Sequence, residues 1–484
     1  MSSVPYSETK APESAERLHR GALGLVDIAA STMANIGPAY SFMFGFGLIV
    51  VTAGIAAPLT IIAAVIAIAL LGNTLSQFSR AQPSTGGFIT FVGKSFGGTS
   101  AVTTALLCGA GYIIAISSVL AVAGWYLEYV LNYYFSWNVP WIIWTVVLTG
   151  FSVWMMYRGV AVSTKLAGFF FGFEMLVLVI VSIASLVKNG SHLSAAPFEW
   201  SHLNNGFSGL APGFPLAVYL FIGWENSAAL AEETGDPRRN VPRAVYLSIA
   251  LMAVLYLLVA YGTVSGFHDN GTKLAAAPIP FITIAHSTLA KVAVIAYLAG
   301  LTSTVGVLIA AVNSQARLVF NAGREGLLPR WIGKVHPTRK TPINAIYAFV
   351  GIAGGIIAFW CLGHLFFGNG GSMDGLNYFD ESGTMGTLLI LVVYFLANLA
   401  LPFYYRKYRP QEFNVVKHLI LPVVGMIVIA VPVYYLCKPP QPQPYDWFPY
   451  AALAILVLSV AYAYLLNRRD PGLGDRVGSI VADE

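Results

Sequence analysis

Apolar segments of about 20 residues follow one another along most of the chain, separated by short polar stretches rich in Gly and Pro. An α-helix of that length crosses the hydrocarbon core of a bilayer, where every backbone polar group must be satisfied internally. Charged residues make up only 10% of the sequence, against about 25% in a typical soluble protein. The sequence therefore predicts an all-α integral membrane protein with twelve transmembrane helices. They are expected near residues 24–51, 55–74, 101–130, 139–157, 165–187, 210–231, 245–266, 288–320, 343–367, 383–404, 416–436 and 447–466.

The distribution of positive charge predicts how these helices are oriented. If the chain alternates through twelve spans, all but four of its 27 Lys and Arg residues fall on the side that carries both termini. Loops rich in Lys and Arg face the cytoplasm. We therefore expect both termini in the cytoplasm. The membrane is expected to be the plasma membrane, here a bacterial inner membrane. The four exceptions are Lys188, Lys273, Lys291 and Lys438.

The sixth apolar segment is interrupted where Gly223 stands next to Trp224 and Glu225. An ionisable side chain inside a membrane helix is costly, so such residues usually serve a function or are paired. A glycine beside it lets the helix open and free backbone groups for a ligand. The motif predicts a broken helix with a binding site at the break.

The first apolar segment carries a similar interruption at Gly37 and Pro38. Proline lacks an amide hydrogen and displaces the preceding helical turn, although a simple kink would give the same pattern. The break in helix 6 lies five helices after this one, and an odd repeat length makes the second copy enter from the opposite side. The pattern predicts inverted repeats of five helices each, with broken helices 1 and 6 at a shared site.

The same pattern divides the chain into a core and peripheral parts. Residues 21–410 are expected to form the five-plus-five core, and residues 411–467 to form helices 11 and 12 outside it. Residues 1–20 and 468–484 are polar and are expected to be flexible cytoplasmic tails.

Four segments carry a resemblance to a known family. They are GPAYS in helix 1, PSTGGF at residues 83–88, GWE with AEETGDPRRNVPRA after helix 6, and ARLVFNAGREGLLP after helix 8. The chain resembles the amino acid–polyamine–organocation (APC) permeases, whose fold is that of the bacterial leucine transporter. The resemblance implies a transporter that works by alternating access on an amino acid or organic amine. Helix 1 departs from the family, because Gly37-Pro38-Ala39 replaces the usual Gly-Ser/Thr-Gly.

An amino acid held at the middle of the membrane needs partners for its carboxylate and for its ammonium group. Broken helices supply amides at one end and carbonyls at the other. We expect the backbone amides of Asn35, Ile36 and Gly37 to bind the carboxylate, unless the groups at the break satisfy one another. The carbonyls expected to bind the amine belong to Ser31, Thr32, Phe221 and Ile222.

Side chains beside the breaks complete the expected substrate site. Trp224 resembles the aromatic gate of the family, and Glu225 is placed to hold a proton or to face a cationic amine. A carboxylate that only stabilises the broken helix is the alternative for Glu225. Further polar residues on other helices are Tyr112, Ser117, Ser118, Tyr394 and Asn398.

Two sets of residues compete as the ion-coupling site. Glu174 in helix 5 resembles the position where proton-coupled members carry a lysine, so Glu174 and Glu225 are candidates for proton coupling. Thr302 and Ser303 in helix 8 resemble the hydroxyl ligands of sodium in the leucine transporter, and hard cations prefer such oxygen ligands. Proton coupling is the expectation, and sodium coupling or substrate exchange are the alternatives.

Charged residues at the cytoplasmic side are expected to act in a gate or in loop structure: Asp27, Arg317, Arg324 and Glu325. The sequence has no nucleotide-binding or metal-ligand motif, so we expect no cofactor, no metal, no nucleic-acid partner and no enzymatic activity. The expected partners are the lipid bilayer, a small amine or amino acid, and a proton or sodium ion. A channel or a membrane sensor would share the helices, but a sensor would need a soluble domain that the sequence does not show.

Overall fold

The structure is a computed structural model that describes residues 23–158, 160–204, 206–324, 326, 328–336, 341–367 and 373–470. The described residues form helices joined by turns and loops, with an isolated β-bridge between Leu23 and Thr234. The tail expected at residues 1–20, and most of that at 468–484, lie outside them.

The long α-helices overlap the segments that the apolar pattern predicts, whereas the short helices at 87–96, 271–276 and 280–289 lie largely between those segments. Their bounds are α1 Leu25–Ile36, α2 Pro38–Ala53, α3 Ala57–Ala81, α4 Gly87–Phe96, α5 Gly98–Phe135, α6 Trp141–Tyr157, α7 Val160–Lys188, α8 Leu210–Tyr219, α9 Asn226–Ala229, α10 Pro237–Gly266, α11 Gly271–Ala276, α12 Pro280–Leu289, α13 Val294–Arg324, α14 Ile343–Phe367, α15 Gly375–Tyr408, α16 Leu421–Cys437 and α17 Phe448–Arg469. Within the described residues, nine helical stretches are long and apolar enough to cross a membrane, and α1 and α6 are shorter apolar helices. The chain is a multi-pass, all-helical membrane protein.

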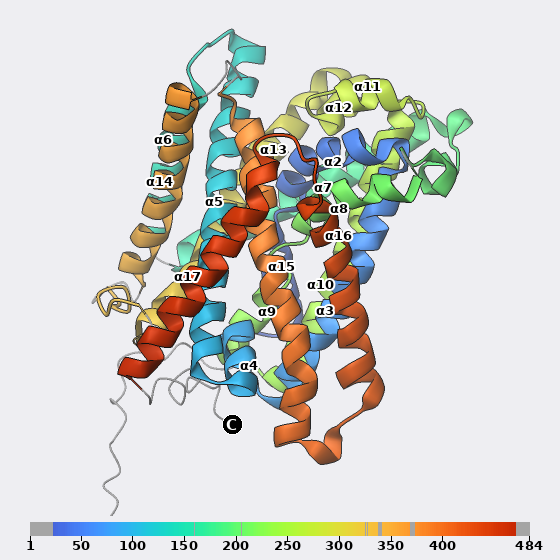
Figure 1. The fold of residues 1–484 in the computed structure, drawn as a ribbon. Coiled ribbons are helices and arrows are strands. Elements are labelled where there is room, and N and C mark those ends of the chain that lie inside the picture. The colour runs from blue at the N-terminus through green and yellow to red at the C-terminus, as the bar shows by residue number, and fades with distance from the viewer. Residues whose placement is uncertain are drawn as a thin grey trace, which may run out of the picture.

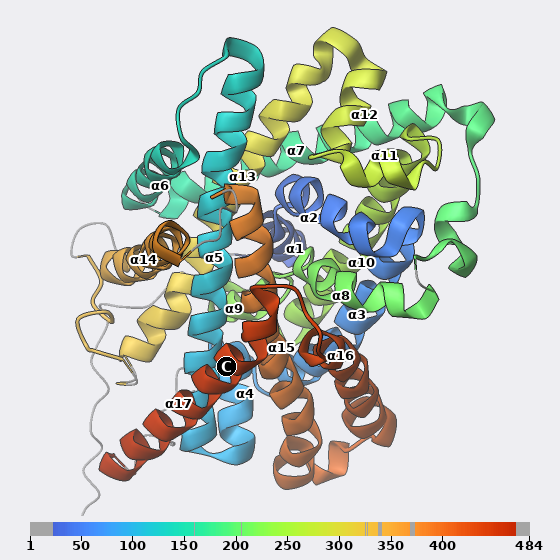
Figure 2. The same cartoon turned by 45° about the horizontal axis from the view of Figure 1, so that its top comes forward.

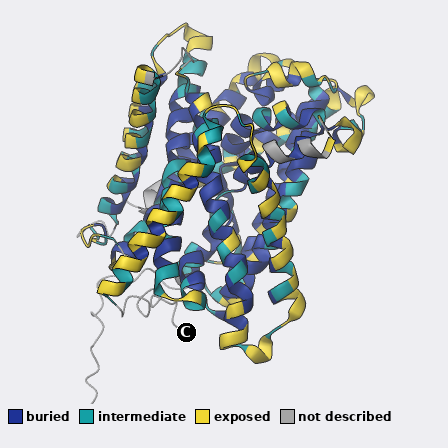
Figure 3. Ribbon diagram, viewed as in Figure 1, coloured by how far each residue is buried: buried dark blue, intermediate teal, exposed yellow. Residues whose placement is uncertain are grey.

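The helices form a bundle in which the short, broken helices are at the centre. The long helices α5 and α15 run side by side, α6 and α14 lie along one edge, and α17 crosses the outside of α5 (Figures 1 and 2). Buried residues concentrate in the middle of the bundle, whereas α14, α16 and α17 expose apolar side chains (Figure 3). Apolar outer faces are what a lipid environment requires, and they are consistent with a membrane-spanning bundle.

The first helix break lies between α1 and α2, as the sequence predicts. Gly37 ends α1 with a left-handed backbone (φ +63°), and Pro38 begins α2. Proline suits the first position of a helix because its missing amide would have no helical partner there. A Cβ atom on Gly37 would lie 1.7 Å from Cγ2 of Val307, so the position also lacks room for a side chain.

The second break lies between α8, which ends at Tyr219, and α9, which begins at Asn226. Gly223 has φ +107°, and a Cβ atom on it would lie 2.6 Å from Nδ2 of Asn35. The same Asn35 Nδ2 donates a hydrogen bond to the Gly223 carbonyl at 3.3 Å. The two predicted breaks are therefore in direct contact, although 188 residues separate Asn35 from Gly223.

Replacing Gly37 by Ala is expected to destabilise the protein by about 1–3 kcal/mol, because the side chain meets both an unfavourable backbone region and Val307. Gly150→Ala is the matched control, since a Cβ atom there has open space around it. Thermal unfolding of the purified variants in detergent measures the difference. Equal midpoints for both variants would contradict the assigned conformation of Gly37.

Candidate substrate-binding site

Glu225 lies at the second break and is buried, with 9% of its surface exposed. Its carboxylate accepts hydrogen bonds from the Gly223 amide at 3.1 Å, from the Tyr394 hydroxyl at 3.3 Å and from the Tyr112 hydroxyl. Trp224 is fully buried and donates from its indole nitrogen to the Tyr394 hydroxyl at 3.1 Å. Since buried carboxylates need such donors, α5 and α15 together hold Glu225 at the break.

Glu174 of α7 lies at the first break and caps the amino end of α2. The first helical position is Pro38, which has no amide hydrogen. The next two amides are both bonded: Ala39 donates to Oε2 of Glu174 at 2.9 Å, and Tyr40 donates to Oγ of Ser303 at 2.9 Å. A carboxylate at a helix N-terminus satisfies a free amide and interacts favourably with the helix dipole. Each break therefore has its own buried carboxylate.

The backbone amides predicted to bind the substrate carboxylate, those of Asn35, Ile36 and Gly37, are not the amides that the break leaves without helical partners. Asn35 and Ile36 lie in the last turn of α1, and the Gly37 amide donates to the Met33 carbonyl at 3.2 Å. Amides at the carboxyl end of a helix point back into that helix and are not free for a ligand. The amides left without helical acceptors at this break belong to Ala39 and Tyr40, at the start of α2. Glu174 and Ser303 accept their hydrogen bonds.

The α1 carbonyls predicted to bind the amine are also not the ones at the end of the helix, because α1 stays helical through Ile36. Ser31 and Thr32 precede the last turn of α1, whose carbonyls are the ones left without helical partners. The Thr32 hydroxyl instead pairs with the Ser227 hydroxyl at 2.8 Å. At the other break, the Phe221 carbonyl accepts from the Trp224 amide at 3.0 Å.

Two small cavities lie against the breaks. One, of about 40 Å³, is lined by residues of both breaks and of α5 and α13, among them Asn35, Ile36, Ile222 and Gly223. The other, of about 30 Å³, adjoins Glu225. Tyr112 lines both, so it stands between the break of α1 and the carboxylate of Glu225.

Several other expected residues lie elsewhere or have local partners. Asn398 packs against Gly425 of α16 and accepts a hydrogen bond from Thr74. The Thr302 hydroxyl donates to the Leu298 carbonyl of its own helix at 2.8 Å. Neither residue lines the two small cavities. The contacts of Asn398 therefore join three helices, whereas the hydroxyl of Thr302 bonds within α13.

Sequence reasoning missed a hydroxyl network beside the first break. The Tyr219 hydroxyl pairs with the Tyr40 hydroxyl at 2.8 Å and with that of Ser118 at 2.6 Å, which joins α8, α2 and α5. Ser117, the neighbouring candidate, pairs with the Tyr378 hydroxyl at 2.7 Å. Tyrosines in apolar segments give no distinctive sequence signal, because most of them are core residues.

A larger polar cavity of about 400 Å³ opens beside α1, α7 and α13. Its lining includes Asp27, Glu233 and Arg317, and Nη1 of Arg317 contacts Oε1 of Glu233 at 2.6 Å. Asp27 accepts from the Gly24 amide at 2.9 Å, so it caps α1. Of the other two charged candidates, Arg324 is the last residue of α13, and Glu325 lies outside the described residues.

Two contacting broken helices at the centre of an all-helical bundle define the class of membrane transporters with the leucine-transporter fold. The fold is similar to the crystal structure of MhsT in complex with L-phenylalanine, at 16% sequence identity and a TM-score of 0.57, covering 92% of this chain and 100% of that one. Residues 23–461 match the family described as "Amino acid permease". The chain belongs to this family of the APC superfamily, whose members are transporters and not enzymes.

Two bacterial relatives show how broad this similarity is. The uncharacterized amino acid permease YecA of Bacillus subtilis (strain 168) is 24% identical over 288 residues, which span 60% of this chain and 66% of that protein. The methylthioribose transporter of the same organism is 24% identical over 427 residues, or 82% of this chain and 85% of that protein. Their names differ in substrate, so similarity at this level does not define one substrate.

The Arg317–Glu233 ion pair is expected to stabilise the carboxyl-terminal part of α13, because both side chains are only about one-fifth exposed. Arg317→Gln and Glu233→Gln should each lower the unfolding temperature, and the double variant should lose no more than either single variant. The difference should largely persist in 1 M salt, because partly buried ion pairs are screened much less than exposed ones. Fully additive losses would show that the two side chains do not interact.

Proposed function

We propose that the protein is a secondary active transporter that imports an amino acid or a related organic amine by alternating access, coupled to protons. The observation that carries this proposal is the pair of buried carboxylates, Glu174 and Glu225, one at each of two contacting helix breaks. The described linings of the two small cavities contain no Lys or Arg. A site with buried carboxylates and no positively charged side chain in its described lining favours a substrate that carries an ammonium group.

The proposed topology has twelve spans with both termini in the cytoplasm of a bacterial inner membrane. Of the nine long apolar stretches, 38–81 holds the second half of the first span and the whole second span, and the shorter helix α6 adds one span more. α1 and α2 together make one broken span, and α8 and α9 another. In this orientation the 400 Å³ cavity beside Arg317 and Glu233 is the cytoplasmic vestibule.

Proton coupling is supported by the position of Glu174. An ionised Glu174 accepts from the Ala39 amide at the amino end of α2, whereas a protonated one loses the favourable charge interaction with that helix end. A change in protonation therefore biases the position of α2, which is part of the binding site.

Sodium coupling is the first alternative, and exchange of one amine for another is the second. Sodium would need several oxygen ligands beside Ser303, whose hydroxyl binds the Tyr40 amide. The Thr302 hydroxyl is turned to the backbone of its own helix. These contacts favour the proton over sodium, and an exchanger would use the same residues without a net gradient.

Uptake of radiolabelled amino acids into proteoliposomes is expected to rise with an inward proton gradient and not with a sodium gradient. Glu174→Gln should remove the response to the proton gradient but retain exchange with preloaded substrate, because the amide keeps an acceptor for Ala39. If a sodium gradient drives uptake in the unchanged protein, proton coupling is wrong and sodium coupling is correct. Uptake that requires preloading would identify an exchanger.

Glu225→Gln is expected to abolish substrate binding or coupling while leaving the fold intact, because Gln is of similar size but lacks the negative charge. Glu381→Gln is a matched control: that carboxylate accepts from the Trp360 indole at 2.6 Å and lines neither small cavity. Ligand-induced thermal stabilisation and gradient-driven uptake should be lost only in the Glu225 variant. Undiminished uptake by that variant would remove Glu225 from the mechanism.

A further inference from the structure

Two buried carbonyl oxygens beside the breaks have no hydrogen-bond partner among the described residues. They are Oδ1 of Asn35 on α1 and Oε1 of Gln315 on α13. The two side chains are 4% and 6% exposed. Leaving such an acceptor unpaired typically costs about 1–3 kcal/mol, so its persistence calls for a donor that binds there.

Both side chains line the same 40 Å³ cavity. The orientation of the Asn35 amide follows from its contact with the second break, since Nδ2 donates to the Gly223 carbonyl and leaves Oδ1 as the free group. A cavity of this size holds only a few non-hydrogen atoms, because one water molecule needs about 10–15 Å³ of such space. The cavity therefore fits a small donor group such as an ammonium, but not a whole amino acid.

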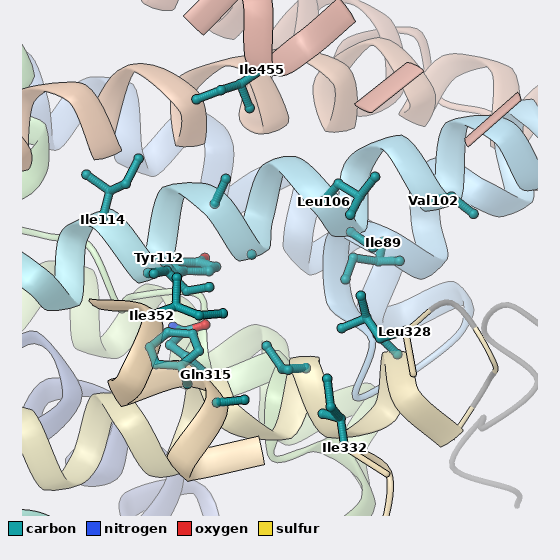
Figure 4. A pocket seen from close by; sticks show the side chains of 18 of the residues that line it. Ile89, Val102, Leu106, Tyr112, Ile114, Gln315, Leu328, Ile332, Ile352 and Ile455 are labelled. Carbon is teal, nitrogen blue, oxygen red and sulfur yellow. The ribbon is translucent and has the colours of Figure 1, made fainter. Parts of the chain in front are cut away.

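Gln315 also stands at a boundary with a much larger cavity. A space of about 470 Å³ lies between α5, α13, α14 and α17, and apart from Tyr112 and Gln315 its described lining is apolar. Figure 4 shows these two side chains at one end of it, with Leu106 and Leu328 farther along. Tyr112 and Gln315 line this cavity and both small ones, so they separate the polar site from the apolar space.

We infer that Gln315 is a substrate-contacting residue that, together with Asn35, accepts hydrogen bonds from the amine of the substrate. The apolar side chain of that substrate occupies the 470 Å³ cavity. This inference rests on the proposed transport function and narrows its substrate class to amines or amino acids with a large apolar side chain.

The amine contact is tested with Gln315→Met, which has similar length and no strong acceptor, and Gln315→Glu, which keeps one. Binding to purified protein is measured for alanine, leucine and phenylalanine. Gln315→Met should weaken binding of all three by about 5- to 100-fold, whereas Gln315→Glu should retain it. Unchanged affinity in the Met variant, with an unfolding temperature like that of the unchanged protein, would overturn the assignment of Gln315.

The apolar cavity is tested with Gly109→Leu, because Gly109 lines it and a Cβ atom there meets no atom within 4 Å. The added side chain should weaken phenylalanine binding by about tenfold or more and leave alanine binding unchanged. Gly150→Leu is the control, since that glycine also has open space but lies on the exposed face of α6. If phenylalanine binds equally well to both variants, a lipid chain rather than substrate occupies the cavity and the inference fails.

Failure of this inference and failure of the proposed function give different results. If the unchanged protein neither binds nor transports any amino acid or amine, the proposed function itself is wrong. If it transports them and the Gln315 and Gly109 variants keep the same affinity and size preference, only the inference is wrong.

Discussion

Every backbone group that a broken helix releases inside a membrane must find a new partner, and the centre of this structure is organised by that requirement. At the first break, Ala39 and Tyr40 have lost helical acceptors, and Glu174 and Ser303 of two other helices replace them. At the second, the Leu220 carbonyl accepts from the Tyr256 hydroxyl at 2.7 Å. The breaks therefore bind α7, α10 and α13 to the site and couple its shape to their positions.

The two carboxylates have different surroundings, which suits them to different roles. Glu174 accepts a hydrogen bond from the Ala39 amide at the amino end of α2, so its charge acts on the backbone of that helix. Glu225 is held by the Gly223 amide and by tyrosines from α5 and α15, next to a cavity. In the proposed cycle, Glu174 responds to the proton and Glu225 faces the substrate. Both bias the same pair of contacting breaks.

Much of the fold could be predicted from the sequence, because its signals are local. Apolar length predicts the helices, and Gly37 with Pro38 and Gly223 with Glu225 predict the breaks. The residue at which α1 ends is harder to predict from the sequence. It depends on the left-handed backbone of Gly37, which lets the helix continue through Ile36. That one turn changes which amides are free.

The site itself was only partly predictable, because its remaining members meet across long sequence distances. Tyr219 pairs with Tyr40 across 179 positions, and no local pattern marks either residue. Gln315 directly precedes the segment ARLVFNAGREGLLP, which the sequence pattern places after helix 8, and only the folded helix shows that its side chain lines three cavities. In contrast, Asn398 has a polar side chain in an apolar helix, but its partners belong to helix packing.

The most direct test of the account is an experimental structure of the protein with a bound amino acid or amine that it transports. We expect the ligand nitrogen within about 3 Å of acceptors at the two breaks, with both helices interrupted at Gly37 and Gly223. Density for a continuous first or sixth helix, or a transported ligand bound away from both breaks, would contradict it.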